Sequence, residues 1–270
     1  MTLTPSAITA AADFIADLRQ RRNGRRPPIE EIPAAFRPAT LDDAYAVQDA
    51  ARPLIAERGR RTPIGWKIGS TSPLMQAALG IPYPCAGTLY AGTVHRGHTS
   101  ADRGDYSKLG FECEVAVRLA AGLPALAGGH TRASVLPAVA AVMTSIELVE
   151  WRFVDPKVAG VPSLVADDFF SCGCVLGPEQ PPEILAGDAD IPGRFTVDGA
   201  VACAGSAQDI LGHPLNSLAW LADHRAARGS PLGAGDVVTL GSIFAALRID
   251  RPCRIEASFD GLGAAAVDVT

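Results

Sequence analysis

Apolar and polar residues alternate with a period of two in the middle of the chain, which is the pattern of a β-strand with two distinct faces. Over residues 111–119 the apolar side chains share one face: Phe111, Cys113, Val115, Val117 and Leu119. The opposite face carries Glu112 and Glu114, two residues apart. The predicted strand therefore places two carboxylates one above the other, on the same side, in an otherwise apolar neighbourhood.

Apolar residues at helical spacing predict helices near both ends of the chain. A first helix is expected over residues 5–22, with Thr4 as its N-cap and a proline at its first position. A second helix should begin at Thr40 and bend at Pro53. A third, amphipathic helix is expected over residues 214–228. The first two helices look like a segment added in front of a strand-rich domain.

Short apolar runs between glycines, prolines and Asp-Gly pairs predict strands in the rest of the chain. They occupy residues 64–69, 142–150, 173–176, 194–197, 200–204, 236–240, 243–247 and 254–259. Residues 95–107 and 156–163 are expected to be loops, and residues 132–141 a helix. Strands without regular helical crossovers favour the α+β class over an alternating α/β fold. We divide the chain into a helical N-terminal segment, residues 1–62, packed on a main domain, residues 63–270.

Composition and charge narrow the range of partners. The 270 residues have a net charge of −5, a pI of about 5.5, 48% hydrophobic and 20% charged residues, which is typical of a globular protein and argues against nucleic acid as the main partner. No apolar run reaches the roughly 18 residues of a membrane helix, and the N-terminus lacks a secretory apolar region. Six cysteines without such a region suggest reduced thiols. We therefore expect a cytoplasmic protein without a membrane partner.

A third carboxylate, Glu147, lies in another predicted apolar strand. Burying a carboxylate without a partner is costly, so Glu112, Glu114 and Glu147 together suggest a divalent-cation site. Oxygen-only ligands favour magnesium, manganese or calcium over zinc. The alternatives are a solvated strand face, and an ion pair of Glu147 with Arg118 or Arg152.

Two further positions could carry chemistry. Lys67 lies between apolar residues and is flanked by Gly65 and Gly69, so its surroundings should either lower its pKa or aim it at an anion. The alternative is a lysine whose charged end reaches solvent. Ser242 follows Gly241 at the end of a predicted strand, where its hydroxyl could reach the edge of a site, although a simple turn serine is an equal alternative.

An ordered set of motifs covers most of the chain: GWKIGSTS at 65–72, FECEVA at 111–116, IELVEWR at 146–152, AWLA at 219–222 and GDVVTLGS at 235–242. The set resembles the 2-keto-4-pentenoate hydratase and 2-oxo-3-hexenedioate decarboxylase family, within the fumarylacetoacetate hydrolase superfamily. The resemblance implies a mixed β-roll around a Mg²⁺ or Mn²⁺ ion held by Glu112, Glu114 and Glu147. It also implies that Lys67 is the active-site lysine and that the protein is a homo-oligomer.

One position departs from the family. Hydratases of this family usually carry an aspartate, thought to take part in acid–base work, where this chain has Cys85. A thiol replaces a carboxylate poorly unless its pKa is depressed. We predict that Cys85, Gly87, Ser171 and Ser242 contribute to substrate binding.

The leading hypothesis is a metal-dependent lyase that acts on a small 2-oxo acid, by hydration of a 2-hydroxydienoate in the catabolism of aromatic compounds. The metal would polarise the 2-oxo group and stabilise an enolate, with Lys67 near the enolate oxygen. Decarboxylation and carbon–carbon hydrolysis would use the same enolate. A catalytically weak partner subunit, and a structural protein whose acidic groups are only ion-paired, are the alternatives from other classes.

Overall fold

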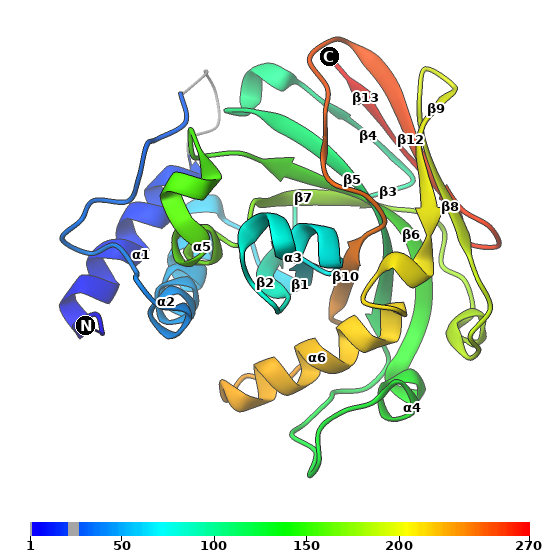
Figure 1. Ribbon diagram of the computed structural model, residues 1–270, viewed down its shortest axis with the longest axis horizontal. Coiled ribbons are helices and arrows are strands. Elements are labelled where there is room, and N and C mark those ends of the chain that lie inside the picture. Colours follow the sequence, from blue (N-terminus) through cyan, green and yellow to red (C-terminus); the bar gives the residue numbers. More distant parts are fainter. Residues whose placement is uncertain (1, 21–26) are drawn as a thin grey trace.

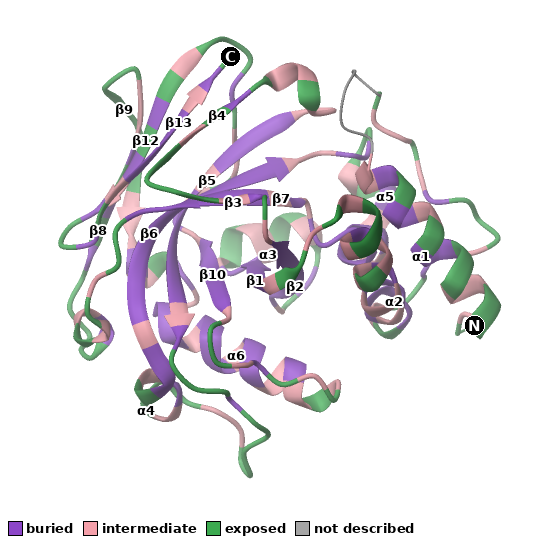
Figure 2. Ribbon diagram, turned by 180° about the vertical axis from the view of Figure 1, so that it is seen from behind, coloured by how far each residue is buried: buried purple, intermediate pink, exposed green. Residues whose placement is uncertain are grey.

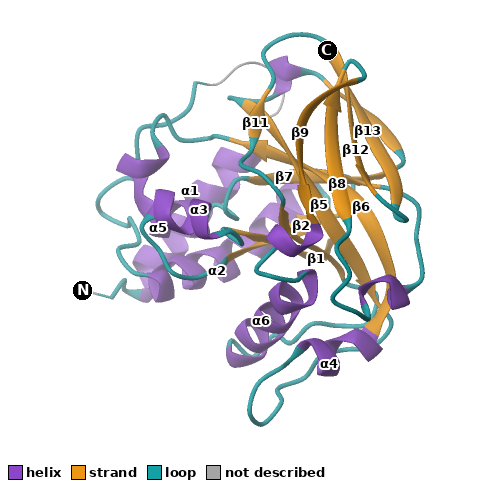
Figure 3. Cartoon of the chain, turned by 45° about the vertical axis from the view of Figure 1, so that its right-hand side comes forward, coloured by secondary structure: helices purple, strands orange, loops and turns teal. Residues whose placement is uncertain are grey.

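A computed structural model describes residues 2–20 and 27–270, which form two β-sheets with helices packed at one side (Figures 1 and 3). The larger sheet has the strand order β2-β1-β10-β5-β6-β7-β3, with β11 paired to β5. Its strands are β1 (Pro63–Gly69), β2 (Cys85–Tyr90), β3 (Val94–Arg96), β5 (Leu109–Leu119), β6 (Val139–Glu150), β7 (Ser171–Leu176), β10 (Val237–Ser242) and β11 (Leu247–Arg248). This mixed arrangement agrees with the expected α+β β-roll.

The smaller sheet has the order β4-β13-β12-β8-β9. Its strands are β4 (His98–Ala101), β8 (Pro192–Val197), β9 (Ala200–Ser206), β12 (Cys253–Phe259) and β13 (Gly263–Val269). The β8–β9 hairpin turns at Asp198 and Gly199, whose φ angles of 50° and 81° are both positive. The Asp-Gly pair therefore forms the hairpin turn that the sequence predicts.

The helices are α1 (Pro5–Gln20), α2 (Leu41–Gly59), α3 (Pro73–Leu79), α4 (Arg132–Val135), α5 (Pro156–Ala166) and α6 (Pro214–Ala227). Short 3₁₀ helices lie at Arg103–Asp105, Leu136–Ala138, Pro182–Leu185 and Ala207–Asp209. None of these helices combines the length and the apolar character needed to cross a membrane.

Helices α1 and α2 pack together and lie beside α5, apart from the smaller sheet (Figure 1). Thr40 caps α2 by accepting a hydrogen bond from the Asp43 N–H, as expected, and Pro53 lies inside that helix. Residues 21 and 22, the expected end of α1, lie outside the described residues. Buried Gln48 of α2 donates to the Ala86 carbonyl of β2 at 2.8 Å and to the Val165 carbonyl of α5 at 2.7 Å. The N-terminal helices are thus hydrogen-bonded to the elements next to the site.

Four local predictions are wrong. The strand expected over residues 243–247 does not form, because only residue 247 of this range belongs to a strand, β11. Residues 95–107 contain strands β3 and β4, which pair in parallel with β7 and β13, far away in the sequence. Residues 156–163 form most of α5, whose start at Asp155 and Pro156 has a cap and a first-turn proline. The helix expected over residues 132–141 ends at Val135 because the backbone beyond Ala138 joins β6 and pairs with β5.

Strands β5 and β6 form the buried centre of the larger sheet (Figure 2). They pair antiparallel over most of their length, with Glu112 opposite Glu147 and Glu114 opposite Ser145. Strand β10 runs along the other side of β5, and β1 lies next to β10. This strand order brings the carboxylates of β5 and β6 close to the lysine of β1.

Candidate active site

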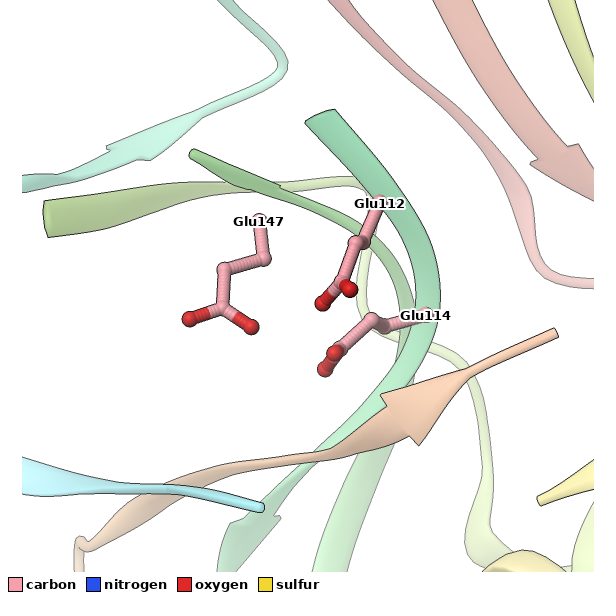
Figure 4. Close-up of side chains that lie close together, drawn as sticks. All are labelled: Glu112, Glu114 and Glu147. Carbon is pink, nitrogen blue, oxygen red and sulfur yellow. The ribbon is translucent and has the colours of Figure 1, made fainter. Parts of the chain in front are cut away.

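The three glutamates predicted from the sequence come together at the centre of the larger sheet (Figure 4). One carboxylate oxygen from each of Glu112, Glu114 and Glu147 lies within 4.8 Å of the other two. Glu114 and Glu147 are completely buried and Glu112 is half-buried. The register explains the cluster, because Glu112 and Glu147 are cross-strand partners and Glu114 is the next residue on the same face.

The electrostatics of this cluster are unfavourable without a cation. Burial and the charge of Glu147 raise the pKa of Glu112 to about 8, with Lys67 acting in the opposite direction. Burial, Glu147 and Glu112 likewise raise the pKa of Glu114. Within the described part of the chain, Glu114 Oε1 and both carboxylate oxygens of Glu147 lack a hydrogen bond of good geometry. Buried carboxylate oxygens that lack donors and face one another fit a hard divalent cation.

Lys67 of β1 extends into the same cluster. Its Nζ atom lies 3.2 Å from Glu147 Oε1 and 5.2 Å from the centre of the Phe169 ring, and its side chain is only 2% exposed. Burial acts to lower the pKa of Lys67, but the charges of Glu147, Glu112 and Glu114 outweigh it, so the pKa is raised. Of the two effects expected from its surroundings, the pKa is not lowered, whereas the side chain is aimed at an anion; the alternative of a lysine that reaches solvent does not apply.

The alternative ion pairs of Glu147 do not form. Arg118 instead makes two hydrogen bonds to Glu179, at 2.9 and 2.7 Å. Arg152 is bonded to Glu150 at 2.7 Å and to Asp167 at 2.6 Å. Both arginines are thus engaged elsewhere, and among the described residues Glu147 forms its ion pair with Lys67.

A cavity of about 470 Å³ opens at Lys67 and Glu112. Near them its lining is polar, with the hydroxyl-bearing residues Ser70, Thr71, Ser72 and Ser242. Ser70 Oγ is buried and has no hydrogen-bond partner among the described residues, so it is available to a ligand. The rest of the lining is mainly apolar. The arrangement can therefore hold an anionic head group beside the carboxylate cluster and a less polar tail beyond it.

The four residues predicted to bind substrate differ in their positions. Ser242 lines the cavity, whereas Cys85, Gly87 and Ser171 are not part of its lining. Cys85 is fully buried, and burial raises its pKa to about 12 against the opposing effect of Lys67, so its thiol is neutral at ordinary pH.

Gly87 and Ser171 both contact the backbone of Asp168. A Cβ atom at Gly87 would lie 2.3 Å from the Asp168 carbonyl oxygen, which explains the glycine. The Ser171 N–H donates to the same carbonyl at 3.1 Å. These two residues thus support the cavity wall from behind.

Sequence reasoning missed the turn at residues 168–170, which forms part of this wall. Asp168, Phe169 and Phe170 have φ angles of 54°, 47° and 69°, a left-handed conformation that is uncommon for aromatic residues. Phe169 and Phe170 both line the cavity. No local sequence pattern is typical of three consecutive left-handed residues, so this turn could not be predicted from its own residues.

Two residues, Thr88 and Arg19, anchor this turn. The Thr88 N–H donates to Asp168 Oδ1 at 2.9 Å. Arg19 of α1 donates to the Asp167 carbonyl at 3.0 Å and forms an ion pair with Asp168 at 3.5 Å. The N-terminal helix therefore takes part in placing the cavity wall.

Comparison with known proteins agrees with this geometry. Residues 85–270 match the family model described as fumarylacetoacetate (FAA) hydrolase C-terminal. The chain is 33% identical to a 2-keto-4-pentenoate hydratase of Paraburkholderia phymatum, over 92% of this chain and 93% of the relative. It is 28% identical to a 4-oxalocrotonate decarboxylase of Pseudomonas putida, over 97% of this chain and 96% of the relative.

Solved structures show the same relationship. The 4-oxalocrotonate decarboxylase from Pseudomonas putida G7, complexed with magnesium and adipate, superimposes with a TM-score of 0.90 at 27% identity, covering 100% of this chain and 99% of the other. Fumarylpyruvate hydrolase from Pseudomonas aeruginosa shares the fold, with a TM-score of 0.59 at 15% identity over 77% of this chain and 89% of the other. The resemblance inferred from the motifs is confirmed, and the chain belongs to the fumarylacetoacetate hydrolase family.

Proposed function

We propose that this chain is a divalent-metal-dependent lyase that hydrates a 2-hydroxydienoate, the enol form of a small 2-oxo acid. The observation that carries the proposal is the group of three carboxylates, two of them completely buried, with protonated Lys67 beside them at a cavity. The similarity to 2-keto-4-pentenoate hydratases over most of the chain supports the reaction. The family resemblance in the sequence motifs supports a role in the catabolism of aromatic compounds.

In this proposal Glu112, Glu114 and Glu147 hold Mg²⁺ or Mn²⁺. Their oxygen atoms form a donor set suited to either ion. Related structures contain magnesium, calcium or Mn²⁺, which supports a divalent cation. When bound, the cation would neutralise the carboxylates and polarise the 2-oxo group of the substrate.

Lys67 supplies a fixed positive charge from the protein. Its Nζ protons can be donated to the oxygen on which negative charge develops, and this stabilises the transition state more than the ground state. The Phe169 ring next to Nζ keeps bulk water away, which strengthens that interaction. The hydroxyls of Ser70 and Ser242 can orient the substrate carboxylate.

Decarboxylation is the second candidate, and the neutral thiol of Cys85 favours it. Hydration requires a group that manages the proton of the attacking water, and a buried thiol with a pKa near 12 does this poorly at neutral pH. Decarboxylation needs the same enolate stabilisation without an attacking water. The overall match to 4-oxalocrotonate decarboxylase is consistent with this candidate.

The test compares both reactions in one preparation. Protein stripped with EDTA is assayed with 2-hydroxypenta-2,4-dienoate and with 4-oxalocrotonate, before and after addition of Mg²⁺ or Mn²⁺. We expect activity only with metal, and we expect Glu114→Gln to lose both metal binding and turnover. Undiminished turnover by metal-free protein would refute the proposal. Metal and oxalate binding without turnover of either compound would instead indicate a catalytically weak partner subunit.

We further propose that residues 1–62 form a helical segment packed on a catalytic β-roll domain, residues 63–270, and that the protein is a homo-oligomer in the cytoplasm. Family resemblance supports the oligomer, and light scattering of the purified protein tests it. A monomer at micromolar concentration would contradict it.

A further inference from the structure

The wall of the cavity beyond the carboxylate cluster is mainly apolar and aromatic. Its largest side chains come from α3, from the end of β6, from the turn at residues 168–170 and from the segment after β10: Met75, Val149, Trp151, Phe169, Phe170 and Phe244. Phe170 lies 5.2 Å from Phe169 and 6.3 Å from Trp151, measured between ring centres. These rings form a continuous surface that suits a hydrocarbon or aryl group.

Positive charge is almost absent from this wall. The only cations in the described lining are Lys67 and Lys157. Lys67 is paired with Glu147 at the head of the cavity. Lys157 is exposed, as is its neighbour Asp155, so both stand where the cavity meets solvent. A ligand tail lying against the aromatic surface therefore finds no buried cation.

The size of the cavity adds a second constraint. Its volume of about 470 Å³ lies within the range of pockets that enclose drug-sized ligands. A five-carbon 2-hydroxydienoate, with eight heavy atoms, would leave much of this space unfilled. The apolar wall thus fits a longer tail than a vinyl group.

We propose that the site selects a 2-oxo acid, or its 2-hydroxydienoate form, with one carboxylate and an extended alkyl or aryl tail, and discriminates against dicarboxylates of equal length. This inference rests on the proposed function, which supplies the head group. Some relatives have names or ligands that contain a second carboxylate, namely a 2-oxo-hept-4-ene-1,7-dioate hydratase and the decarboxylase complexed with adipate. The lining of this chain points to a different tail.

The physical reason is desolvation. A second carboxylate buried against Trp151 and Phe170 loses its hydration, and no hydrogen bond or ion pair replaces it. Each methylene placed on the same surface increases affinity by about fourfold. The two effects act in the same direction when a terminal methyl group is compared with a terminal carboxylate.

Calorimetric titration of the wild-type protein at saturating Mg²⁺ tests the inference with four ligands. Oxalate measures the head group alone, 2-oxohexanoate and 2-oxoadipate form a pair of equal chain length, and 2-oxo-4-phenylbutanoate measures room for an aryl tail. We expect 2-oxohexanoate to bind at least about tenfold more tightly than 2-oxoadipate, and 2-oxo-4-phenylbutanoate at least as tightly as 2-oxohexanoate. Equal or tighter binding of 2-oxoadipate would overturn the inference.

Variants identify the responsible wall. Met75→Lys places a cation on the apolar surface and should strengthen 2-oxoadipate binding relative to 2-oxohexanoate, whereas the matched control Met75→Leu should leave the preference unchanged. Lys157→Met should also leave it unchanged. If 2-oxoadipate binds tightly to the wild type and loses affinity in Lys157→Met, the lysine at the mouth recognises a dicarboxylate and the inference fails.

The oxalate result distinguishes failure of the tail selectivity from failure of the proposed function. Oxalate binding that requires Mg²⁺, without any preference among the longer acids, would overturn the tail selectivity and leave the proposed function intact. Failure of all four ligands to bind with Mg²⁺ would overturn both.

Discussion

Arg19 links the N-terminal helix α1 to the strained turn of the cavity wall, and its replacement by methionine tests whether this link matters for the site. The Arg19 side chain is 7% exposed and pairs with Asp167 at 3.4 Å and with Asp168 at 3.5 Å. Methionine keeps much of the side-chain volume and removes the charge. Asp167 retains its bond to Arg152, whereas Asp168 retains the Thr88 N–H.

The magnitudes decide the expected outcome. Removing one partner of a buried ion pair costs about 3–5 kcal/mol, and the remaining Arg152 bond places this case near the lower value. Each of the three left-handed residues of the turn stores about 1–2 kcal/mol. The free energy lost with the Arg19 ion pairs is therefore comparable to the strain energy of the turn. The turn should relax, and the release of strain should offset part of the loss in stability. We expect a net loss of about 1–3 kcal/mol in the free energy of unfolding.

Relaxation of the turn would move Phe169 away from Lys67. A desolvated cation–π contact contributes about 2 kcal/mol, so the affinity for oxalate at saturating Mg²⁺ should fall by about tenfold or more. Urea unfolding measures the stability and calorimetry measures the affinity. Arg58→Met is the matched control, because Arg58 of α2 pairs with Asp13 and Asp17 of α1 rather than with the turn, and it is 30% exposed and therefore far less costly to remove. Unchanged oxalate affinity in a destabilised Arg19→Met protein would refute the role of the turn.

Three other predictions concern the same site. Gly69→Ala places a Cβ atom 2.5 Å from the Phe169 ring, so it should lower the free energy of unfolding in urea by about 1–3 kcal/mol and weaken oxalate binding. In the control Gly187→Ala the nearest atom to the new Cβ is 3.8 Å away, so neither quantity should change. Equal effects of the two substitutions would contradict this prediction. The pKa of Glu112 is raised from 4.5 to about 8, so the metal-free fold binds more protons than the unfolded chain between these values. The stability of the metal-free protein should therefore fall as the pH rises through that range, and saturating Mg²⁺ should reverse the loss. Thermal melts at about pH 5 and about pH 9, with and without Mg²⁺, measure both effects. If the carboxylates bind no metal, Mg²⁺ will not restore the stability at the higher pH. Cys85→Asp restores a carboxylate beside Lys67 and should raise the rate of hydration more than the matched variant Cys85→Ser does; an equal rise in both would show that the carboxylate is not what hydration lacks.

The carboxylate cluster could be anticipated because its signals are local. Alternation with a period of two assigns Glu112 and Glu114 to one face of β5 without any knowledge of neighbouring strands. Glu147 stands out because a carboxylate in an apolar strand is costly unless it has a partner. The β8–β9 turn and the cap of α2 were likewise predictable, since each depends on two or three adjacent residues.

The remaining features depend on contacts that are distant in sequence. Strands β3 and β4 are short and polar, and exist because β7 and β13 offer parallel partners. The pKa of Lys67 is raised rather than lowered because carboxylates from β5 and β6 surround it, and desolvation alone suggests the opposite direction. The left-handed turn at Phe169 is maintained by α1 and β2, neither of which is adjacent to it in sequence.

The boundary predicted at residue 62 divides the first two helices from the elements that follow, but it does not separate scaffold from site. Arg19 of α1 fixes one wall of the cavity. Tyr45 of α2 accepts a hydrogen bond from the Ala86 N–H at 3.1 Å, and Gln48 donates to the Ala86 carbonyl, so α2 clamps the backbone next to Cys85. A thiol clamped in this buried position cannot become exposed to solvent and ionise without breaking these contacts. In the proposed reaction, proton transfer to the substrate would therefore fall to Lys67, the cationic group at the head of the cavity, and the contacts of α2 with the backbone next to Cys85 would support that assignment.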